Sequence, residues 1–438
     1  MGQLSRRLPG ALLLAAAMLM AVAAPVRGFT GFGAMHADAT YGVEMTFSVA
    51  LPGGAPDRLE LLLRFEGSDA TLVAPVEASG SSATYRWDAA ARSLTPNTRI
   101  TYRWQATDAG HGSLSPEGTL RYDDDRPGLD WHTARIGGAT VHWYGSAEAE
   151  ARRFGQLSAD AASAAETLLG DTLAGPIDIF VYLSRDEFFG ALGPGAREWT
   201  GAATFPELRT IFMWLGGGST DFLETTITHE VTHVVFHDAT DNPFHGPATW
   251  FNEGLATWAE RQSADRQQAT VAGEASNGGL LAFNAIIDQF PIGGQAASLS
   301  YAEGATMIQL IIDRYGRGAI GKIAAAWKAG ASDAEALQAG TGIPAEQLYA
   351  EYFAPFGVGV PQPVSPAPIP ASNVDKPPQP PASGEPIPVT TASPVASAAA
   401  VPAKPADVSI GLYLAGVAVV ALLVGGLWWR ARRKGSAP

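Results

Sequence analysis

Residues 219–238 read STDFLETTITHEVTHVVFHD, and this stretch decides the fold of the second half of the chain. Five apolar residues recur along it at helical spacing: Phe222, Ile227, Val231, Val234 and Val235. Ser219 or Thr220 can cap the first turn, where acidic side chains also follow, as helix N-termini favour. The pattern predicts an α-helix.

His229 and His233 lie four residues apart on this helix. Residues i and i+4 share one helix face, so both imidazoles can reach one metal ion. Glu230 is turned aside from them and is placed to accept a proton from a water that the metal activates. A catalytic zinc needs a third protein ligand and one open position. Glu253 offers that ligand, because the 20 residues after His233 leave room for one loop and a returning helix.

At this point the chain resembles the gluzincin metallopeptidases, the clan of thermolysin and aminopeptidase N. WFNEGLA (250–256) is similar to the pattern W-L-N-E-G-F-A, in which the glutamate binds zinc. SYAEGA (300–305) is similar to the clan's S-Y-x-K-G-A segment, whose tyrosine binds the oxyanion. Taken with the ends and the N-terminal domain described below, the resemblance is closest to bacterial peptidase MA-like proteins.

The resemblance implies an α+β, thermolysin-like zinc metallopeptidase domain over residues 130–359. It also implies one Zn²⁺ per chain, bound by His229, His233 and Glu253. Glu230 then acts as the general base, and Tyr301 donates a hydrogen bond to the oxyanion. A buried core tyrosine remains the alternative for Tyr301.

The segment GAATF (201–205) departs from the aminopeptidase-N pattern. Those enzymes carry G-A-M-E-N in about this place, and its glutamate holds the free amine of the substrate. Here Thr204 stands in the segment and no acid does. This departure favours endopeptidase action on a peptide or protein substrate, or an unknown amide-hydrolase activity, over aminopeptidase action. We also expect the strand at 209–215 to align an extended peptide by β-addition.

Other polar residues near the motif have non-catalytic interpretations. His237 lacks the glycine-assisted turn of a metzincin, which favours a surface or supporting role. His245 is expected in a loop beside the site. Asp238 and Asp241 could hold a second ion, but a solvated loop is favoured. Thr257 could orient a ligand, and helix packing explains it nearly as well.

The two ends of the chain predict a membrane protein. Residues 1–28 are typical of an export signal, with an uncleaved anchor as the alternative. Residues 410–429 are uncharged and long enough for a transmembrane helix, and the basic tail 430–438 is expected in the cytoplasm. Residues 360–407 contain 14 prolines and predict a disordered stalk. The sequence therefore predicts a single-pass cell-membrane protein with an extracytoplasmic body.

Residues 36–125 predict an all-β domain that resembles an immunoglobulin or fibronectin-type sandwich. RLELLLRF (58–65) and TRITYRW (98–104) alternate apolar and polar residues. YDDDRP (122–127) predicts the boundary; its aspartates could hold calcium, but a solvated linker is favoured. Beyond it the pattern predicts strands at 139–145, 177–183, 201–205 and 209–215, a helix at 148–170, and mainly helices from about 219.

Composition excludes several functions. The chain of 438 residues has no cysteine, so disulfides and thiolate metal sites are excluded. Its net charge is −14, although the segments 1–28 and 430–438 hold seven basic and no acidic residues. The body is therefore too acidic for a nucleic-acid partner. STDFLETTITHE is too polar for an intramembrane protease. The remaining alternative is a non-catalytic adhesion or scaffold protein with a structural zinc, against which Glu230 argues.

Overall fold

The computed structural model describes residues 28–90, 94–193, 201–260, 264–291 and 294–361. Apart from residues 28, 360 and 361, the predicted signal, stalk, membrane helix and tail lie outside these ranges. Within them, no helix is both long and apolar enough to cross a bilayer. The chain divides into two compact units. Unit 1 comprises the part up to Ala39, Val43–Asp88 and Arg99–Leu120, and unit 2 comprises Thr40–Gly42, Ala89–Thr98 and the part from Arg121 onward.

Unit 1 is all β, as predicted for the N-terminal region, and consists of two sheets with the strand orders β1-β2-β6-β5 and β4-β3-β7-β8. The strands are β1 Met35–Thr40, β2 Glu44–Ala50, β3 Arg58–Phe65, β4 Thr71–Pro75, β5 Ala78–Ser79, β6 Ser82–Asp88, β7 Thr98–Asp108, β8 His111–Leu114 and β9 Gly118–Tyr122, which also pairs with β7. Period-two alternation buries Ile100, Tyr102 and Trp104 of β7. The Tyr102 ring lies 5.2 Å from that of Phe47 in the other sheet, so the two sheets pack through their inner faces.

Unit 2 is built on a five-stranded sheet with the order β10-β11-β12-β14-β13. Its strands are β10 His132–Ile136, β11 Ala139–Trp143, β12 Ile177–Tyr182, β13 Ala202–Phe205 and β14 Thr210–Trp214. The three central strands are parallel, whereas β10 and β13 pair antiparallel with their neighbours. All six residues of β12 are buried, because helices cover both faces of the sheet.

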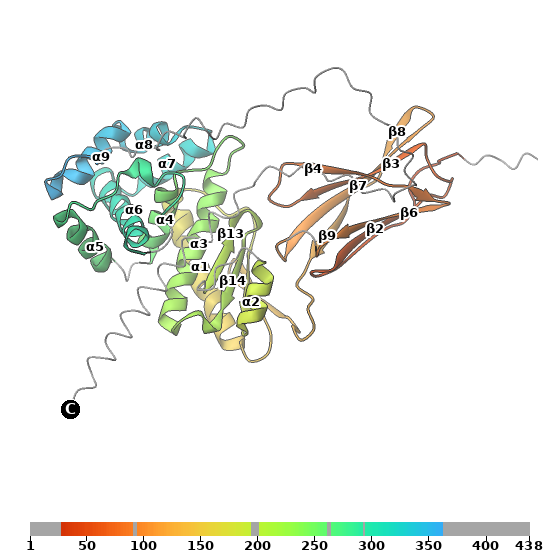
Figure 1. Ribbon diagram of the computed structural model, residues 1–438, viewed down its shortest axis with the longest axis horizontal. Coiled ribbons are helices and arrows are strands. Elements are labelled where there is room, and N and C mark those ends of the chain that lie inside the picture. Colours follow the sequence, from red (N-terminus) through yellow and green to blue (C-terminus); the bar gives the residue numbers. More distant parts are fainter. Residues whose placement is uncertain (1–27, 91–93, 194–200, 261–263, 292–293, 362–438) are drawn as a thin grey trace, which may run out of the picture. The chain divides into compact units, whose positions relative to one another are not determined.

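The helices of unit 2 are α1 Glu148–Leu169, α2 Arg185–Leu192, α3 Thr220–Thr240, α4 Thr249–Ala259, α5 Ala264–Ser276, α6 Gly294–Tyr315, α7 Gly318–Lys328, α8 Asp333–Thr341 and α9 Ala345–Phe353. Four short 3₁₀ turns accompany them at Pro206–Leu208, Leu215–Gly217, Phe283–Ala285 and Ala354–Phe356. Helices α1 and α3 share a core with one face of the sheet, and α2 packs on the other. Figure 1 shows α4 to α9 grouped beside α3. The α+β prediction for this part of the chain is therefore confirmed.

The segment YDDDRP does not behave as a solvated linker at its centre. Asp124 is buried, and both its carboxylate oxygens accept hydrogen bonds from the Arg126 guanidinium, at 2.7 and 2.6 Å. Tyr182 of β12 donates a further hydrogen bond to Asp124 at 2.9 Å. The solvated-linker prediction is wrong for this residue, because the buried carboxylate is neutralised by a neighbouring cation. The contacts serve the folded core of unit 2.

Candidate functional site

Helix α3 carries the two candidate histidines as the sequence predicts. Ser219 is its N-cap, and the Ser219 hydroxyl accepts a hydrogen bond from the backbone N–H of Phe222 at 3.3 Å. His229 and His233 lie one turn apart in its buried middle, with ring centroids 4.7 Å apart. The helix packs against the sheet on one side and against α4 and α7 on another, which removes the histidines from bulk water.

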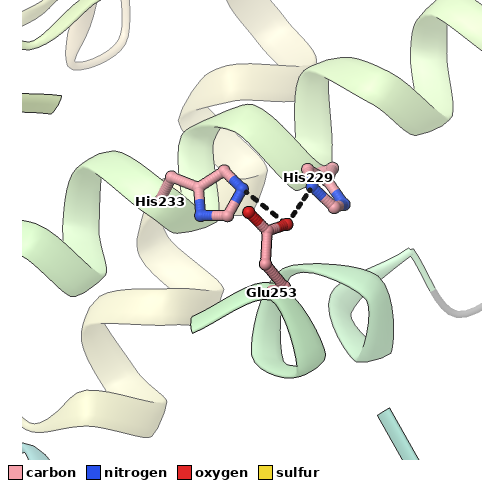
Figure 2. Close-up of side chains that lie close together, drawn as sticks. All are labelled: His229, His233 and Glu253. Carbon is pink, nitrogen blue, oxygen red and sulfur yellow. Dashed lines mark ion pairs between the residues drawn. The ribbon is translucent and has the colours of Figure 1, made fainter. Parts of the chain in front are cut away.

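Helix α4 supplies the third ligand atom. Figure 2 shows Glu253 reaching from α4 toward both imidazoles of α3. Its Oε2 atom lies 3.5 Å from Nε2 of His229 and 3.5 Å from Nε2 of His233. One ligand atom from each residue falls within 4.8 Å of the others, so the three form a candidate metal site.

The spacing of these atoms suits zinc. Ligands bound at about 2.0–2.1 Å in a tetrahedral site lie about 3.3 Å from one another. The observed 3.5 Å separations are close to that value. Two of the atoms, Nε2 of His229 and Oε2 of Glu253, are buried and have no hydrogen-bond partner among the described residues. A metal ion would satisfy both, and the donor set of two imidazoles and a carboxylate is one that zinc accepts.

Two further side chains orient the imidazoles. Oε1 of Glu260 lies 2.9 Å from Nδ1 of His229, and Oδ1 of Asn252 lies 2.9 Å from Nδ1 of His233. Because a carboxylate and an amide oxygen can only accept, each Nδ1 donates its proton. Each Nε2 is then left with the lone pair that a metal requires. No sequence motif marks either residue for this role, although Glu260 follows Glu253 by two helical turns and Asn252 adjoins it.

The buried carboxylates and imidazoles of the cluster stabilise each other's charged forms. Burial opposes the ionised form of Glu253, but the two imidazoles outweigh it and lower the pKa of this carboxyl to about 2. Burial also opposes the charged form of His229. The nearby carboxylates of Glu253 and Glu260 outweigh that effect and raise the pKa of His229 to about 10. In the metal-free protein the carboxylates therefore hold a proton at His229, which a metal ion must displace.

Glu230 lies next to the ligand cluster and is buried. Burial raises the pKa of this carboxyl, which suits a group that must take up a proton near neutral pH. Thr204 of β13 donates its hydroxyl proton to Oε2 of Glu230, with 2.5 Å between the oxygens. Oε1 of Glu230 has no hydrogen-bond partner among the described residues. Thr204 of the sheet thus binds one carboxylate oxygen of Glu230, whereas the other oxygen is left to accept a proton.

Tyr301 is brought beside the cluster by α6. Its ring centroid lies 6.5 Å from that of His229 and 4.9 Å from that of Phe290, and the side chain is buried. Helices α4 and α6 approach closely at Gly254 and Gly304. A Cβ atom added to Gly254 would lie 2.5 Å from the backbone carbon of Gly304. This close crossing brings the α6 segment that carries Tyr301 near the metal-binding segment of α4.

The other polar candidates have different surroundings from those expected. Asp238 lies within α3, not in a loop, and accepts a hydrogen bond from the backbone N–H of Ala174 at 2.9 Å. Asp241 is the C-cap of α3, and its N–H donates to the carbonyl of His237. Thr257 is buried, and its hydroxyl has no partner among the described residues, so orientation of the ligands falls to other side chains.

A cavity of about 490 Å³ adjoins the candidate site. Asn252 and Glu253 line one part of it, and the loop residue His245 lines another, together with Asp288 and Asp333. His245 is exposed, as the sequence predicts for a loop beside the site. Of the three proposed ligands, Glu253 alone is among the residues that line this cavity.

Comparison with known proteins gives one match to a family model. The model of the Peptidase MA superfamily matches residues 158–354, the part that contains the candidate site. No curated protein matches the chain. A solved M1 zinc metallopeptidase from Deinococcus radiodurans is 14% identical, covers 78% of this chain and 96% of its own, and has a TM-score of 0.32.

A two-domain M1 zinc metallopeptidase mutant, solved with bound L-tryptophan, is also 14% identical. The alignment covers 77% of this chain and 97% of that one, with a TM-score of 0.32. At TM-scores this low, neither alignment establishes a shared arrangement of the whole chain. The family match and the ligand geometry remain the two grounds for interpreting the site.

Proposed function

We propose, from the premise that the chain belongs to the peptidase MA superfamily through residues 158–354, that the protein is a zinc-dependent endopeptidase. The observation that carries the proposal is the convergence of His229, His233 and Glu253 beside the uncommitted oxygen of Glu230. Three ligands and one adjacent base suit a catalytic site, whereas structural zinc sites take four protein ligands. The adhesion or scaffold alternative is less well supported for that reason.

Each residue has a distinct part in the proposed reaction. His229, His233 and Glu253 hold one zinc ion per chain. Zinc bound there supplies a Lewis acid and lowers the pKa of a water from about 15.7 to about 7. Glu230 accepts the proton of the attacking water and passes it to the leaving amine. Tyr301 donates its phenolic O–H to the carbonyl oxygen as that atom gains negative charge.

The edge strand β13 is proposed to align the substrate. The expectation that the strand at 209–215 does so is wrong, because β14 pairs with β12 on one side and with β13 on the other. Among the described residues β13 pairs only with β14, so its other edge has no strand partner there. The four residues of β13 are buried, and we propose that an extended peptide pairs with this edge when the substrate binds. Ala202–Phe205 contains no acidic side chain to hold a free amine. That composition favours cleavage within a chain over removal of its first residue.

The proposal also includes the location of the enzyme. The export signal and the uncharged segment 410–429, followed by a basic tail, support a single-pass protein with its catalytic body outside the cytoplasm. The substrate would then be an extracytoplasmic peptide or protein. The N-terminal β region is proposed to be an immunoglobulin-like or fibronectin-like accessory domain.

Digestion of a peptide library by the full-length protein tests this function. Half of each peptide is supplied with an acetylated N-terminus, which removes the free amine. We expect internal cleavage of both halves, loss of cleavage with a chelator, and recovery on addition of Zn²⁺. No cleavage by the zinc-loaded protein would overturn the peptidase assignment. Cleavage of the free-amine peptides alone would overturn the endopeptidase assignment.

A further inference from the structure

We propose that Thr204 is a positioning residue that holds the general base Glu230 and ties it to the strand that aligns the substrate. The inference rests on the proposed function. It begins from a contact that joins two parts of the site, the edge of the sheet and the metal-binding helix. Helix α3 and strand β13 pack directly against each other, which brings the two side chains together.

The contact between the two side chains has the geometry of a strong hydrogen bond. The Thr204 hydroxyl donates to Oε2 of Glu230 over 2.5 Å, a separation typical of a hydroxyl bound to a carboxylate. Both residues are almost wholly buried, with 5% of Thr204 and 1% of Glu230 exposed. A hydroxyl carries one proton, so Oε2 is the oxygen that it engages. Oε1 remains the oxygen that can take a proton from water.

The register of β13 determines the direction in which the backbone N–H and C=O of Thr204 point. The N–H of Trp214 donates to the carbonyl of Gly201 at 2.9 Å, so Gly201 faces β14. In an antiparallel pair, hydrogen-bonded and non-hydrogen-bonded positions alternate along the strand. The paired positions Ala202 with Met213 and Thr204 with Ile211 are therefore non-hydrogen-bonded. The backbone N–H and C=O of Thr204 point to the outer edge, where a peptide strand would bind.

In this proposal the backbone of Thr204 binds the substrate, and its side chain binds the general base Glu230. A peptide that pairs with β13 is positioned relative to the backbone of Thr204. The Glu230 carboxylate is fixed relative to the same residue by one hydrogen bond. The distance between the base and the bond to be cleaved is then set through a single rigid residue, and such preorganisation lowers the barrier to reaction.

The substitutions Thr204→Val and Thr204→Ser separate the hydroxyl from the backbone. Valine keeps the branched shape and the strand but cannot donate, whereas serine keeps the donor. We expect Thr204→Val to lower kcat by about 10- to 100-fold with KM within about twofold, because the peptide-binding backbone is retained. Thr204→Ser should stay within about threefold of the wild-type kcat. Thr225→Val is the matched control, since among the described residues its hydroxyl binds the backbone carbonyl of Asp221 within α3 and no group of the site.

A second measurement uses the zinc-free, full-length protein and needs no activity. Thr204→Val should lower the midpoint of thermal unfolding by about 2–4 °C when Glu230 is present. In a Glu230→Ala background the same substitution should have almost no effect, because its partner is gone. Zinc content is measured on every preparation and should be equal in the wild type and the Thr204 variants.

The outcomes are distinct. Wild-type kcat in Thr204→Val, or an equal loss of kcat in Thr204→Val and Thr204→Ser, would overturn the inference. So would a midpoint shift of the same size in both Glu230 backgrounds, since that would mean that the hydroxyl acts on the fold and not on the base. If the zinc-loaded wild type cleaves no peptide, the proposed function fails. The thermal comparison then decides by itself whether Thr204 holds Glu230.

Discussion

Glu260 and Asn252 show how the residues around a metal site determine what its ligands can do. An imidazole binds a metal through a nitrogen that carries no proton, and the partner of the other nitrogen decides which one that is. In this protein a carboxylate and an amide oxygen make that choice for His229 and His233. The ligand set therefore extends beyond the three residues that would contact the ion.

Glu260→Gln should weaken metal binding while leaving the three ligands in place. The carboxylate accepts from His229 and increases the basicity of its ring, and loss of such a partner costs about 10- to 100-fold in metal affinity. Competition with a chromogenic zinc chelator measures the change. Glu150→Gln, on the exposed first turn of α1, is the control and should bind zinc as the wild type does. An unchanged affinity in Glu260→Gln would mean that the hydrogen bond does not support the ligand.

Glu303 should make stability depend on pH. Its side chain is fully buried, and burial raises the pKa of this carboxyl from 4.5 to about 8. Because the folded-state pKa is raised, the stabilising effect is complete below about pH 4.5 and is lost as the pH rises through about 8. Glu303→Gln, which can still accept the hydrogen bond from the N–H of Leu281, removes this dependence.

The Glu303→Gln variant and the wild type should therefore have similar unfolding free energies near pH 5. Their difference should grow with pH, by at most about 1.4 kcal/mol per unit, in favour of the variant. Urea unfolding at pH 5, 7 and 9 measures the difference. Parallel curves for the two proteins across that range would contradict the assignment.

At the level of single residues, the sequence predicts the metal ligands better than the side chains that hydrogen-bond to the site. The pair His229 and His233 can be recognised in the sequence because the helical period places both side chains on one face of the helix. Thr204 could be named only as a missing acid, since no sequence pattern shows that a strand residue contacts Glu230. The burial of Asp124 could not be predicted for a similar reason, because Tyr182, which binds it in addition to Arg126, lies 58 residues away in the chain.

The crossing of α4 and α6 is the element-level feature that assembles the site. Two glycines meet there, and a Cβ atom on Gly304 would lie 2.6 Å from the carbonyl oxygen of Trp250. Backbone atoms cannot move aside as a flexible side chain can. The glycines next to Glu253 and shortly after Tyr301 therefore have a packing role of their own, which allows the two motifs to approach.

Gly254→Ala should destabilise the protein by about 1–3 kcal/mol or more, because its new methyl group meets backbone. Gly273→Ala in α5 is the matched control. Nothing lies within 4 Å of its added Cβ, so the better helix propensity of alanine should stabilise it by up to about 1 kcal/mol. Chemical denaturation measures both. Equal stability of Gly254→Ala and the wild type would show that α4 and α6 can separate at no cost.

The hydrophobic periodicity of the sequence predicts the individual strands and helices closely, but it does not predict which strands pair with each other. The strands predicted at 177–183 and 209–215 appear as β12 and β14, and the helix around the histidines appears as α3. The order β12-β14-β13 could not be predicted, because an antiparallel return of β13 leaves no local signal in its four residues. Because of this order the edge strand is β13 and not β14, and we therefore propose that the substrate binds at β13.

For the whole molecule, we propose from the sequence of the two ends that the body of the protein lies outside the cytoplasm. Protease added to intact cells should cut the proline-rich segment 360–407 and release the body as one fragment. An antibody against unit 2 would detect that fragment in the medium, and a cytoplasmic protein serves as the control for cell integrity. Protection of the body until the membrane is broken would reverse the proposed topology.

The proposed mechanism requires Glu230 to accept a proton at a zinc site that other residues hold. Glu230→Gln keeps the length and helix position of the side chain and removes its ability to take a proton. The decisive measurement is zinc content and peptide turnover on the same preparations of wild type and Glu230→Gln. We expect about one zinc per chain in both proteins and turnover reduced by about 100- to 10,000-fold in the variant. Turnover at the wild-type rate by zinc-loaded Glu230→Gln would contradict the mechanism.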